Sequence, residues 1–117
     1  MPLRKAVQRL TKPVDELDRE ALEHYCDELG ATPMNEITPR HPTRVAGEVR
    51  SVRIVPRAGA DALEVNVSDG RGSVVAVFLG RRKIAGMSPG RRVLLSAVAG
   101  RDGNRFILYN PEYQLLS

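Results

Sequence analysis

LEVNVSDGRGSVVAVFL, residues 63–79, is the stretch that decides the fold. Its first part alternates Leu63, Val65 and Val67 with polar residues, which is the pattern of a half-buried strand. The four residues 69–72, Asp-Gly-Arg-Gly, are a strong turn signal, and an apolar run follows over 73–79. The stretch therefore predicts two antiparallel strands joined by a tight turn.

The length of this turn fixes the register of the predicted hairpin. A four-residue turn places Leu63 opposite Phe78, and cross-strand neighbours share a face of the sheet. We therefore expect Phe78 in the core and Val75, Val77 and Leu79 on the outer face, where they would form an exposed aliphatic strip. A slip of one residue would reverse this arrangement and expose Phe78.

The flanking segments add three more strands. Residues 45–54 alternate in two opposite phases, which indicates one long strand with a bulge or bend. The remaining segments are a loop at 56–61, a connector at 80–90, a strand at 92–99, a turn at 100–104 and a strand at 105–109. Five strands in about 70 residues favour a small barrel, because closure removes unpaired edges. We expect a mainly β fold, a five-stranded OB-fold barrel, with an SH3-like barrel as the alternative.

The chain before the strands carries helical signals. Apolar residues recur at helical spacing over 14–29, and Gly30 suits a C-cap. A shorter amphipathic helix is predicted over 3–10, and three prolines indicate an extended linker after Gly30. The predicted organisation is an N-terminal α-helical extension at 1–30, a proline-containing linker at 31–43 and an OB-fold domain at 44–117. The apolar stripe of the longer helix needs a surface, either this barrel or a second copy of the chain.

The charge of the chain is divided unevenly along its length. The 117 residues carry a formal net charge of +4, but residues 1–39 hold five basic and eight acidic side chains. The remaining residues hold 13 basic and six acidic side chains. A basic body behind an acidic front segment is typical of a protein with a polyanionic partner, although the coding bias of a GC-rich genome would also enrich arginine.

Four short motifs resemble those of nucleic-acid-binding OB domains. They are V-x-G-x-V at 45–49, D-G-x-G at 69–72, P-G-x-x-V at 89–93 and Asn-Pro-Glu-Tyr at 110–113. The pattern is similar to anticodon-binding OB domains and to the wedge domain of the RecG helicase. With the LGRR run at 79–82, it also resembles small stand-alone bacterial OB-fold proteins. The resemblance covers residues 44–113 and implies an OB fold that binds nucleic acid.

Candidate binding residues are the cations in and beside the predicted loops. We expect phosphate contacts from Arg57, Arg71, Arg81, Arg82, Lys83, Arg101 and Arg105. Tyr109 is a candidate for stacking on a base, with packing in the barrel as its alternative. Because aromatic residues make up only 4% of the chain, the pattern favours low-specificity binding of single-stranded nucleic acid through its backbone. The alternative is a protein–protein interaction module or homo-oligomer that uses the outer face of the third strand or the N-terminal helix.

Several other classes of protein find no support in the sequence. His24 and Cys26 are two apart on a predicted helix and point to different sides, and the chain has no phosphate-loop motif or nucleophile elbow. A single cysteine excludes an internal disulfide and a Cys-rich metal site. We expect a non-catalytic protein without metal or cofactor.

The sequence also bears on location. No apolar run approaches the roughly 20 residues of a membrane helix, and no apolar signal core follows the basic start. We expect a cytoplasmic protein without a membrane span. A weaker alternative is attachment of residues 1–12 to an anionic membrane surface.

Overall fold

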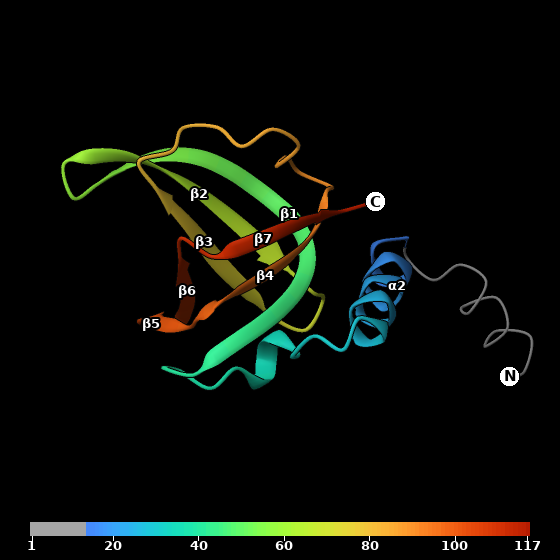
Figure 1. Cartoon of the computed structure of the whole chain (residues 1–117). Helices are drawn as coiled ribbons and strands as arrows, with labels where there is room; N and C mark the ends of the chain where they lie inside the picture. Colours follow the sequence, from blue (N-terminus) through green and yellow to red (C-terminus); the bar gives the residue numbers. More distant parts are fainter. Residues whose placement is uncertain (1–13) are drawn as a thin grey trace, which may run out of the picture.

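The computed structural model describes residues 14–117 and is mainly β (Figure 1). The expected class is therefore confirmed. Predictions that fall on residues 1–13, a helix over 3–10 and membrane attachment through 1–12, lie outside the described residues. In chain order, the elements are α2 (Val14–Glu28), the 3-10 helix η1 (Met34–Glu36), β1 (Pro42–Arg57), β2 (Ala60–Ser68), β3 (Ser73–Leu79), β4 (Arg92–Val98), β5 (Gly100–Asp102), β6 (Arg105–Tyr109) and β7 (Glu112–Leu116).

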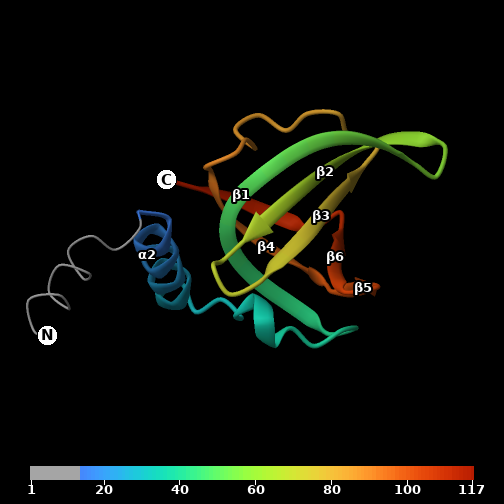
Figure 2. The same ribbon diagram turned by 180° about the vertical axis from the view of Figure 1, so that it is seen from behind.

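The long strand β1 organises the sheet. Its first half pairs with β4 and its second half with β2, both antiparallel, and the pairing with β2 shifts register between Val49 and Ser51. This is the bulge that the change of alternation phase predicts. The bulge lets β1 bend strongly, so that the sheet curls around its own inner face (Figure 2). The complete strand order is β5-β6-β3-β2-β1-β4-β7, with β3 and β6 parallel.

A closed five-stranded barrel is not confirmed. The sheet has seven strands, and within residues 14–117 no ladder joins its two edge strands, β5 and β7. The two strands beyond the predicted five arise in segments that the sequence analysis does not assign to strands. The segment after Pro111 adds β7 along β4, and the predicted turn before β6 contains the short strand β5. Only Ala99 separates β4 from β5, so the chain runs directly from the strand beside the edge strand β7 to the opposite edge of a curled but open sheet.

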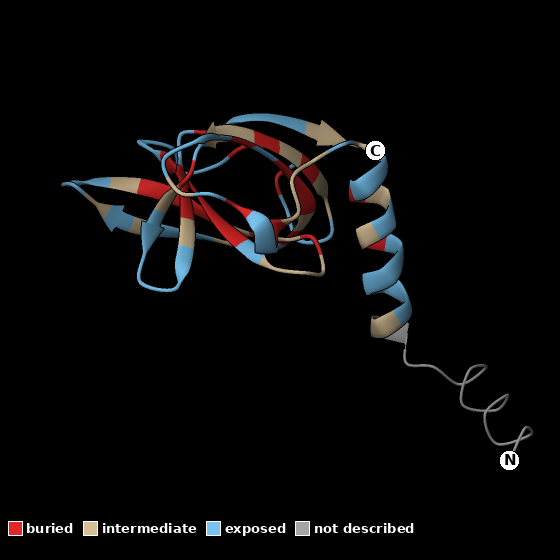
Figure 3. Ribbon diagram, turned by 90° about the horizontal axis from the view of Figure 1, so that it is seen from below, coloured by how far each residue is buried: buried red, intermediate tan, exposed pale blue. Residues whose placement is uncertain are grey.

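The predicted register of the β2–β3 hairpin is confirmed. Leu63 lies opposite Phe78 and Ser68 opposite Ser73, and Phe78 is only 4% exposed within the main core. The main core lies on the concave inner face of the sheet, and Figure 3 shows buried positions along its strands. The core residues with the least exposure include Val45, Val65, Val93 and Leu108, which come from four different strands.

The prediction of an exposed aliphatic strip on the outer face of β3 is wrong for two of its three residues. Val75 and Val77 are buried and pack with Ala62 and Ile107 in a second, smaller cluster, while Leu79 is exposed as expected. The two valines are buried because they pack with each other, with Ala62 and Ile107, and with the partly buried Val55.

The loop expected at 56–61 is instead a tight β-hairpin. β1 continues to Arg57 and β2 begins at Ala60, so only Ala58 and Gly59 form the turn. Both have positive φ angles, 52° and 79°, as a type I′ turn requires. Proline and glycine in the sequence Pro-Arg-Ala-Gly-Ala-Asp indicate that the strand is interrupted, but they do not indicate that only two residues form the turn.

The N-terminal segments are fastened to the sheet. Helix α2 ends at Glu28, one residue before the predicted end, and Gly30 has a φ of 70° as expected of a C-cap. Leu22 and Cys26 pack against Ala46 of β1. Within the predicted linker, Met34 and Ile37 belong to the main core and β1 already begins at Pro42. The division at 1–30, 31–43 and 44–117 stays a prediction. Over residues 14–117, no helix has both the length and the apolarity to cross a membrane.

Candidate functional site

A row of four side chains crosses the outer face of the sheet. The registers place Arg53 of β1 opposite Glu64 of β2, Glu64 opposite Val77 of β3, and Val77 opposite Tyr109 of β6. Side chains on one row point to the same side, and the core residues of these strands lie at the alternate positions. The row therefore belongs to the convex, outer side of the sheet and defines the centre of a candidate site.

Glu64 is a buried carboxylate held by two arginines. It is 2% exposed, and its Oε1 accepts hydrogen bonds from Nε and Nη2 of Arg53 at 3.1 and 2.8 Å. Its Oε2 lies 3.5 Å from Nη2 of Arg57. Burial raises the pKa of Glu64, but the hydrogen bonds from Arg53 and Arg57 and the charges of Arg53 and Arg105 outweigh the effect of burial. The pKa therefore lies below its usual range.

Arg57 also reaches Tyr109 on the far side of the face. Its Nη1 donates a hydrogen bond of 3.2 Å to the Tyr109 hydroxyl, and its guanidinium carbon lies 5.8 Å from the ring centroid. Strands β2 and β3 lie between β1 and β6, so this contact crosses two strands, a span of roughly 14 Å between the backbones. The small Ala62 and the buried Val77 lie beneath the crossing side chains, which explains their burial.

Arg105 completes the group that we call the basic face: Arg53, Arg57, Arg105 and Tyr109 around Glu64. Arg105 begins β6 and is exposed. It lies four residues from Tyr109, which is ~13 Å along a strand. The face thus carries three guanidinium groups and one carboxylate, and the exposed Tyr109 ring lies at one end. Such an arrangement attracts polyanions and can stack on flat rings.

Replacing Glu64 with Gln should destabilise the fold in a pH-dependent manner. A carboxylate with a lowered pKa stabilises the fold above the unfolded-state pKa of about 4.3, and this contribution is lost as the pH falls through the folded-state pKa. We expect E64Q to lose about 1–2 kcal/mol at pH 7, less than for breaking a fully buried pair because Arg53 is mostly exposed. Urea unfolding at pH 7 and pH 3.5 measures the difference, with the exposed Glu112→Gln as the control. An E64Q deficit that stays constant over this range would contradict the charged role of Glu64.

The basic connector after β3 lies near the Arg57 end of the basic face. Gly80 N donates to Asp61 O at 2.9 Å, which ties the start of the connector to the β1–β2 hairpin. Arg82 forms an exposed ion pair of 3.1 Å with Asp61. Arg81 and Lys83 are exposed, and neither forms an ion pair with another residue of the described part of the chain. The structure thus brings the connector and Arg57 to one end of the sheet.

Arg101 and Arg71 have different surroundings. Arg101, in the β5–β6 hairpin, donates to Gly103 O at 3.2 Å and lies over the Phe106 ring at 5.5 Å. Arg71 lies in the β2–β3 turn and forms a two-pronged ion pair with Asp27 of α2, both contacts at 2.8 Å. This pair raises the pKa of Arg71 and lowers that of Asp27. Of the predicted cations, Arg71 is thus the one already engaged by an acidic helix.

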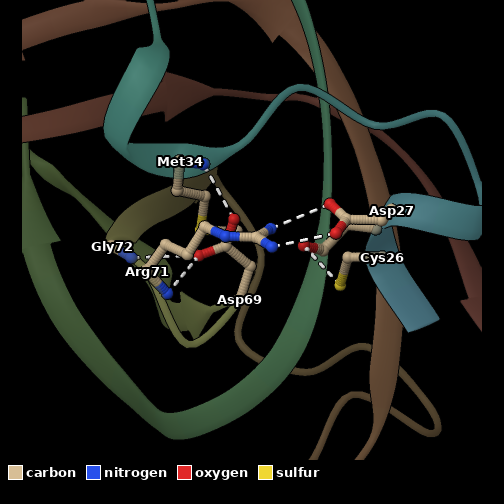
Figure 4. A network of polar contacts seen from close by, with 7 residues as sticks. Cys26, Asp27, Met34, Asp69, Arg71 and Gly72 are labelled. Carbon is tan, nitrogen blue, oxygen red and sulfur yellow. Dashed lines mark hydrogen bonds and ion pairs between the residues drawn. The ribbon is translucent and has the colours of Figure 1, made fainter. Parts of the chain in front are cut away.

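The β2–β3 turn around Arg71 is a dense polar network (Figure 4). Asp69 is 1% exposed, and its carboxylate accepts hydrogen bonds from the backbone N–H groups of Met34, Arg71 and Gly72. This network fixes η1 and the turn relative to one another and, through Arg71, positions α2. It is a structural joint that holds the N-terminal segments on the sheet.

Cys26 does not form a nucleophilic pair with His24. The thiol is buried and its Sγ donates to Ala46 O at 3.3 Å, whereas His24 is exposed and contacts Glu28 at 2.9 Å. Burial, with a smaller effect from Asp69, raises the pKa of the Cys26 thiol to about 11. The protonated thiol is the weak form of this nucleophile. In residues 14–117, no cluster of three or more metal-ligating side chains is present.

Sequence reasoning missed Arg53 and Glu64, the centre of the basic face. Both occupy polar positions of alternating strands, so the alternation of Val52 with Ile54 and of Leu63 with Val65 indicates that they lie on the outer side. Their pairing depends on the β1–β2 register, and the sequence predicts a longer loop where the structure has a two-residue hairpin turn.

Comparison with known proteins supports the fold. No known family and no curated relative matches the chain. One similar solved structure is RecG bound to a three-way DNA junction, with a TM-score of 0.61 and 16% sequence identity. The match covers 100% of this chain and 17% of the RecG chain, so this chain spans about a sixth of that protein's length. This likeness is consistent with an OB-like fold, in agreement with the motifs quoted above.

Proposed function

We propose that this protein binds single-stranded nucleic acid with low sequence specificity, through its basic face. The observation that carries the proposal is the group of Arg53, Arg57 and Arg105 around Glu64, with the exposed Tyr109 ring beside it. Guanidinium groups bind phosphate oxygens in two-pronged geometry, and an aromatic ring accepts any base by stacking.

The buried carboxylate supports this proposal by positioning the cations. Glu64 balances one of the three positive charges and holds Arg53 and Arg57 in place, so less rotamer entropy is lost when phosphate binds. Each guanidinium has five N–H donors, and the contacts with Glu64 and Tyr109 occupy only some of them. Free donors on an exposed Arg53 and a half-buried Arg57, both held in place, suit a phosphate backbone.

Neighbouring cations extend the proposed site at both ends of the basic face. Arg81 and Lys83 extend the basic face beyond Arg57, together with Arg82, which also forms an ion pair with Asp61. Arg101 extends the face beyond Arg105. Arg71 is left out because Asp27 already pairs with it. RecG in its solved structure is bound to a DNA junction, which supports nucleic acid as the ligand class at the level of the fold.

The proposal is for a binding protein without catalysis. The raised pKa of Cys26 and its burial support the non-catalytic part, since the one thiol is protonated and enclosed. The rival role, a protein-interaction module or homo-oligomer, loses much of its expected surface, because Val75 and Val77 are buried. Leu79 and α2 are what remain for that role.

A salt series tests the proposal. Binding of the protein to fluorescent single-stranded DNA, single-stranded RNA and duplex is measured from 50 to 200 mM salt. Three to five phosphate contacts give a slope of about −2 to −3.5 in log K against log salt, so affinity should fall roughly 20- to 100-fold. Both single strands should bind more tightly than duplex. Affinity that does not change with salt, or no binding at 50 mM, would overturn the proposal.

A further inference from the structure

A surface groove begins at Tyr109, the residue that lies at one end of the basic face. It has a volume of about 540 Å³ and lies where the first residues of β1, the last residues of β4 and the β6–β7 connection meet. Its lining includes Arg44, Ser96, Val98, Tyr109, Asn110 and Glu112. Because Arg57 holds the Tyr109 hydroxyl, the same ring belongs to the basic face and to this groove.

The groove offers apolar surface that a solvent-facing sheet ordinarily avoids. Val98 is 59% exposed and Tyr109 is 48% exposed, two of the largest exposures among the bulky apolar residues of the described chain. A groove of this size, lined by an aromatic ring, aliphatic groups and a few polar atoms, has the composition of a small-ligand site.

Polar groups at the rim supply both a donor and an acceptor. Leu79 N donates to Asn110 Oδ1 at 2.9 Å, which fixes the orientation of the amide and leaves its NH₂ group as a donor. Glu112 is an exposed carboxylate that forms no ion pair within residues 14–117. Across the strands, Arg44 lies opposite Ser96 and Ser96 opposite Glu112, so one cation also lines the groove.

We propose that this groove takes one nucleobase of a strand whose phosphates lie on the basic face. The proposal rests on the proposed function and deepens it, because it names the part of the ligand that the groove contacts. The Tyr109 ring stacks on the base, Val98 forms an apolar floor, and Asn110 and Glu112 face the polar edge of the base. Continuity through Tyr109 favours this occupant, since a strand on the basic face passes the mouth of the groove.

The test compares two strands of equal charge. A 12-residue thymidine strand and a strand of the same length with abasic sites throughout are titrated with the wild-type protein. Stacking of one base should make the thymidine strand bind about 5- to 150-fold more tightly, with the same salt slope for both strands. Equal affinity for both strands would overturn the groove proposal while the proposed function stands. Absence of binding by either strand at 50 mM salt would overturn both.

A matched pair of variants localises the effect. Val98→Gln removes the apolar floor at an exposed position, and Leu17→Gln makes the same kind of change on the exposed side of α2. V98Q should lose most of the base-dependent factor, which is the ratio of the affinities for the thymidine and abasic strands, and should keep its affinity for the abasic strand. L17Q should behave as wild type. Circular dichroism checks that both are folded. A base-dependent factor that V98Q retains, or that L17Q loses equally, would overturn the assignment to this groove.

Tyrosine fluorescence gives an independent readout. The chain has no tryptophan and three tyrosines, so stacking of a base on Tyr109 should quench part of the tyrosine emission. Tyr109→Phe should lose this quenching, because the emitting phenol that the base contacts has been removed. Quenching that persists in Y109F would place the base at another tyrosine and overturn the proposal.

Discussion

Replacement of Arg53, Arg57 and Arg105 together by glutamine is expected to lower the affinity for single-stranded nucleic acid about 100-fold at 0.1 M salt. Each phosphate contact to a single strand contributes about −0.7 to the slope of log K against log salt, so three contacts contribute about −2. Over the tenfold range from 1 M to 0.1 M salt, that slope corresponds to the stated factor. A salt series on wild type and variant measures both the affinity and the change of slope.

The control must remove the same charge elsewhere. Arg19, Arg40 and Arg50 are exposed and lie outside the basic face, and their replacement by glutamine gives the same change in net charge. We expect this second triple variant to lose less than tenfold in affinity, through long-range attraction alone. Equal losses in the two triple variants would show that net charge, and not the basic face, attracts the strand.

Stability is the other concern with the first triple variant, because Glu64 would lose its cationic partners. Glutamine at 53 and 57 can still donate hydrogen bonds to the carboxylate, and adding Glu64→Gln removes the buried charge altogether. The quadruple variant should therefore be at least as stable as the triple variant in urea, with the same weak binding. Recovery of binding in the quadruple variant would mean that the triple variant had failed through unfolding.

Local signals explain what was predictable from the sequence. The register of β2 with β3 follows from a four-residue turn and strict alternation, and both are contained in residues 63–79. The end of α2 follows from Gly30 and the bulge in β1 from a change of phase. In each case the residues that determine the structure are neighbours in the chain.

The features that could not be predicted from the sequence depend on contacts between distant segments. Burial of Val77 depends on Arg57 and Tyr109, which are 52 residues apart and cross above it. The engagement of Arg71 depends on Asp27, 44 residues away. Arg53 and Glu64 are closer in sequence, but their pairing depends on a two-residue turn that the proline and glycine of residues 56–61 do not specify. Charge along the sequence therefore predicted a basic body without indicating which cations share a face.

Gly47, the central residue of the V-x-G-x-V motif, is expected to tolerate no side chain. A Cβ there would lie 2.6 Å from the backbone oxygen of Ser68 and 2.9 Å from Cγ1 of Val67, inside van der Waals contact. The position is buried, and Glu48 beside it pairs with Ser68, so β1 lies close to the end of β2 where the strand bends. The Ser68 backbone cannot withdraw without disturbing the first pair of this ladder.

We therefore expect Gly47→Ala to destabilise the fold by about 3 kcal/mol, the upper end of the cost of overpacking, and to lower Tm by about 12 °C. Gly100→Ala is the control, because a Cβ there meets only Ile107 O at 3.5 Å, an ordinary contact, and it should change stability by less than about 1 kcal/mol. Thermal and urea unfolding measure both variants. If the two glycines proved equally tolerant, close approach of β1 to Ser68 would not be what requires glycine at position 47. If only Gly47 proved intolerant, this motif residue would owe its identity to packing of the bent strand, which is the feature that curls the sheet and presents the basic face.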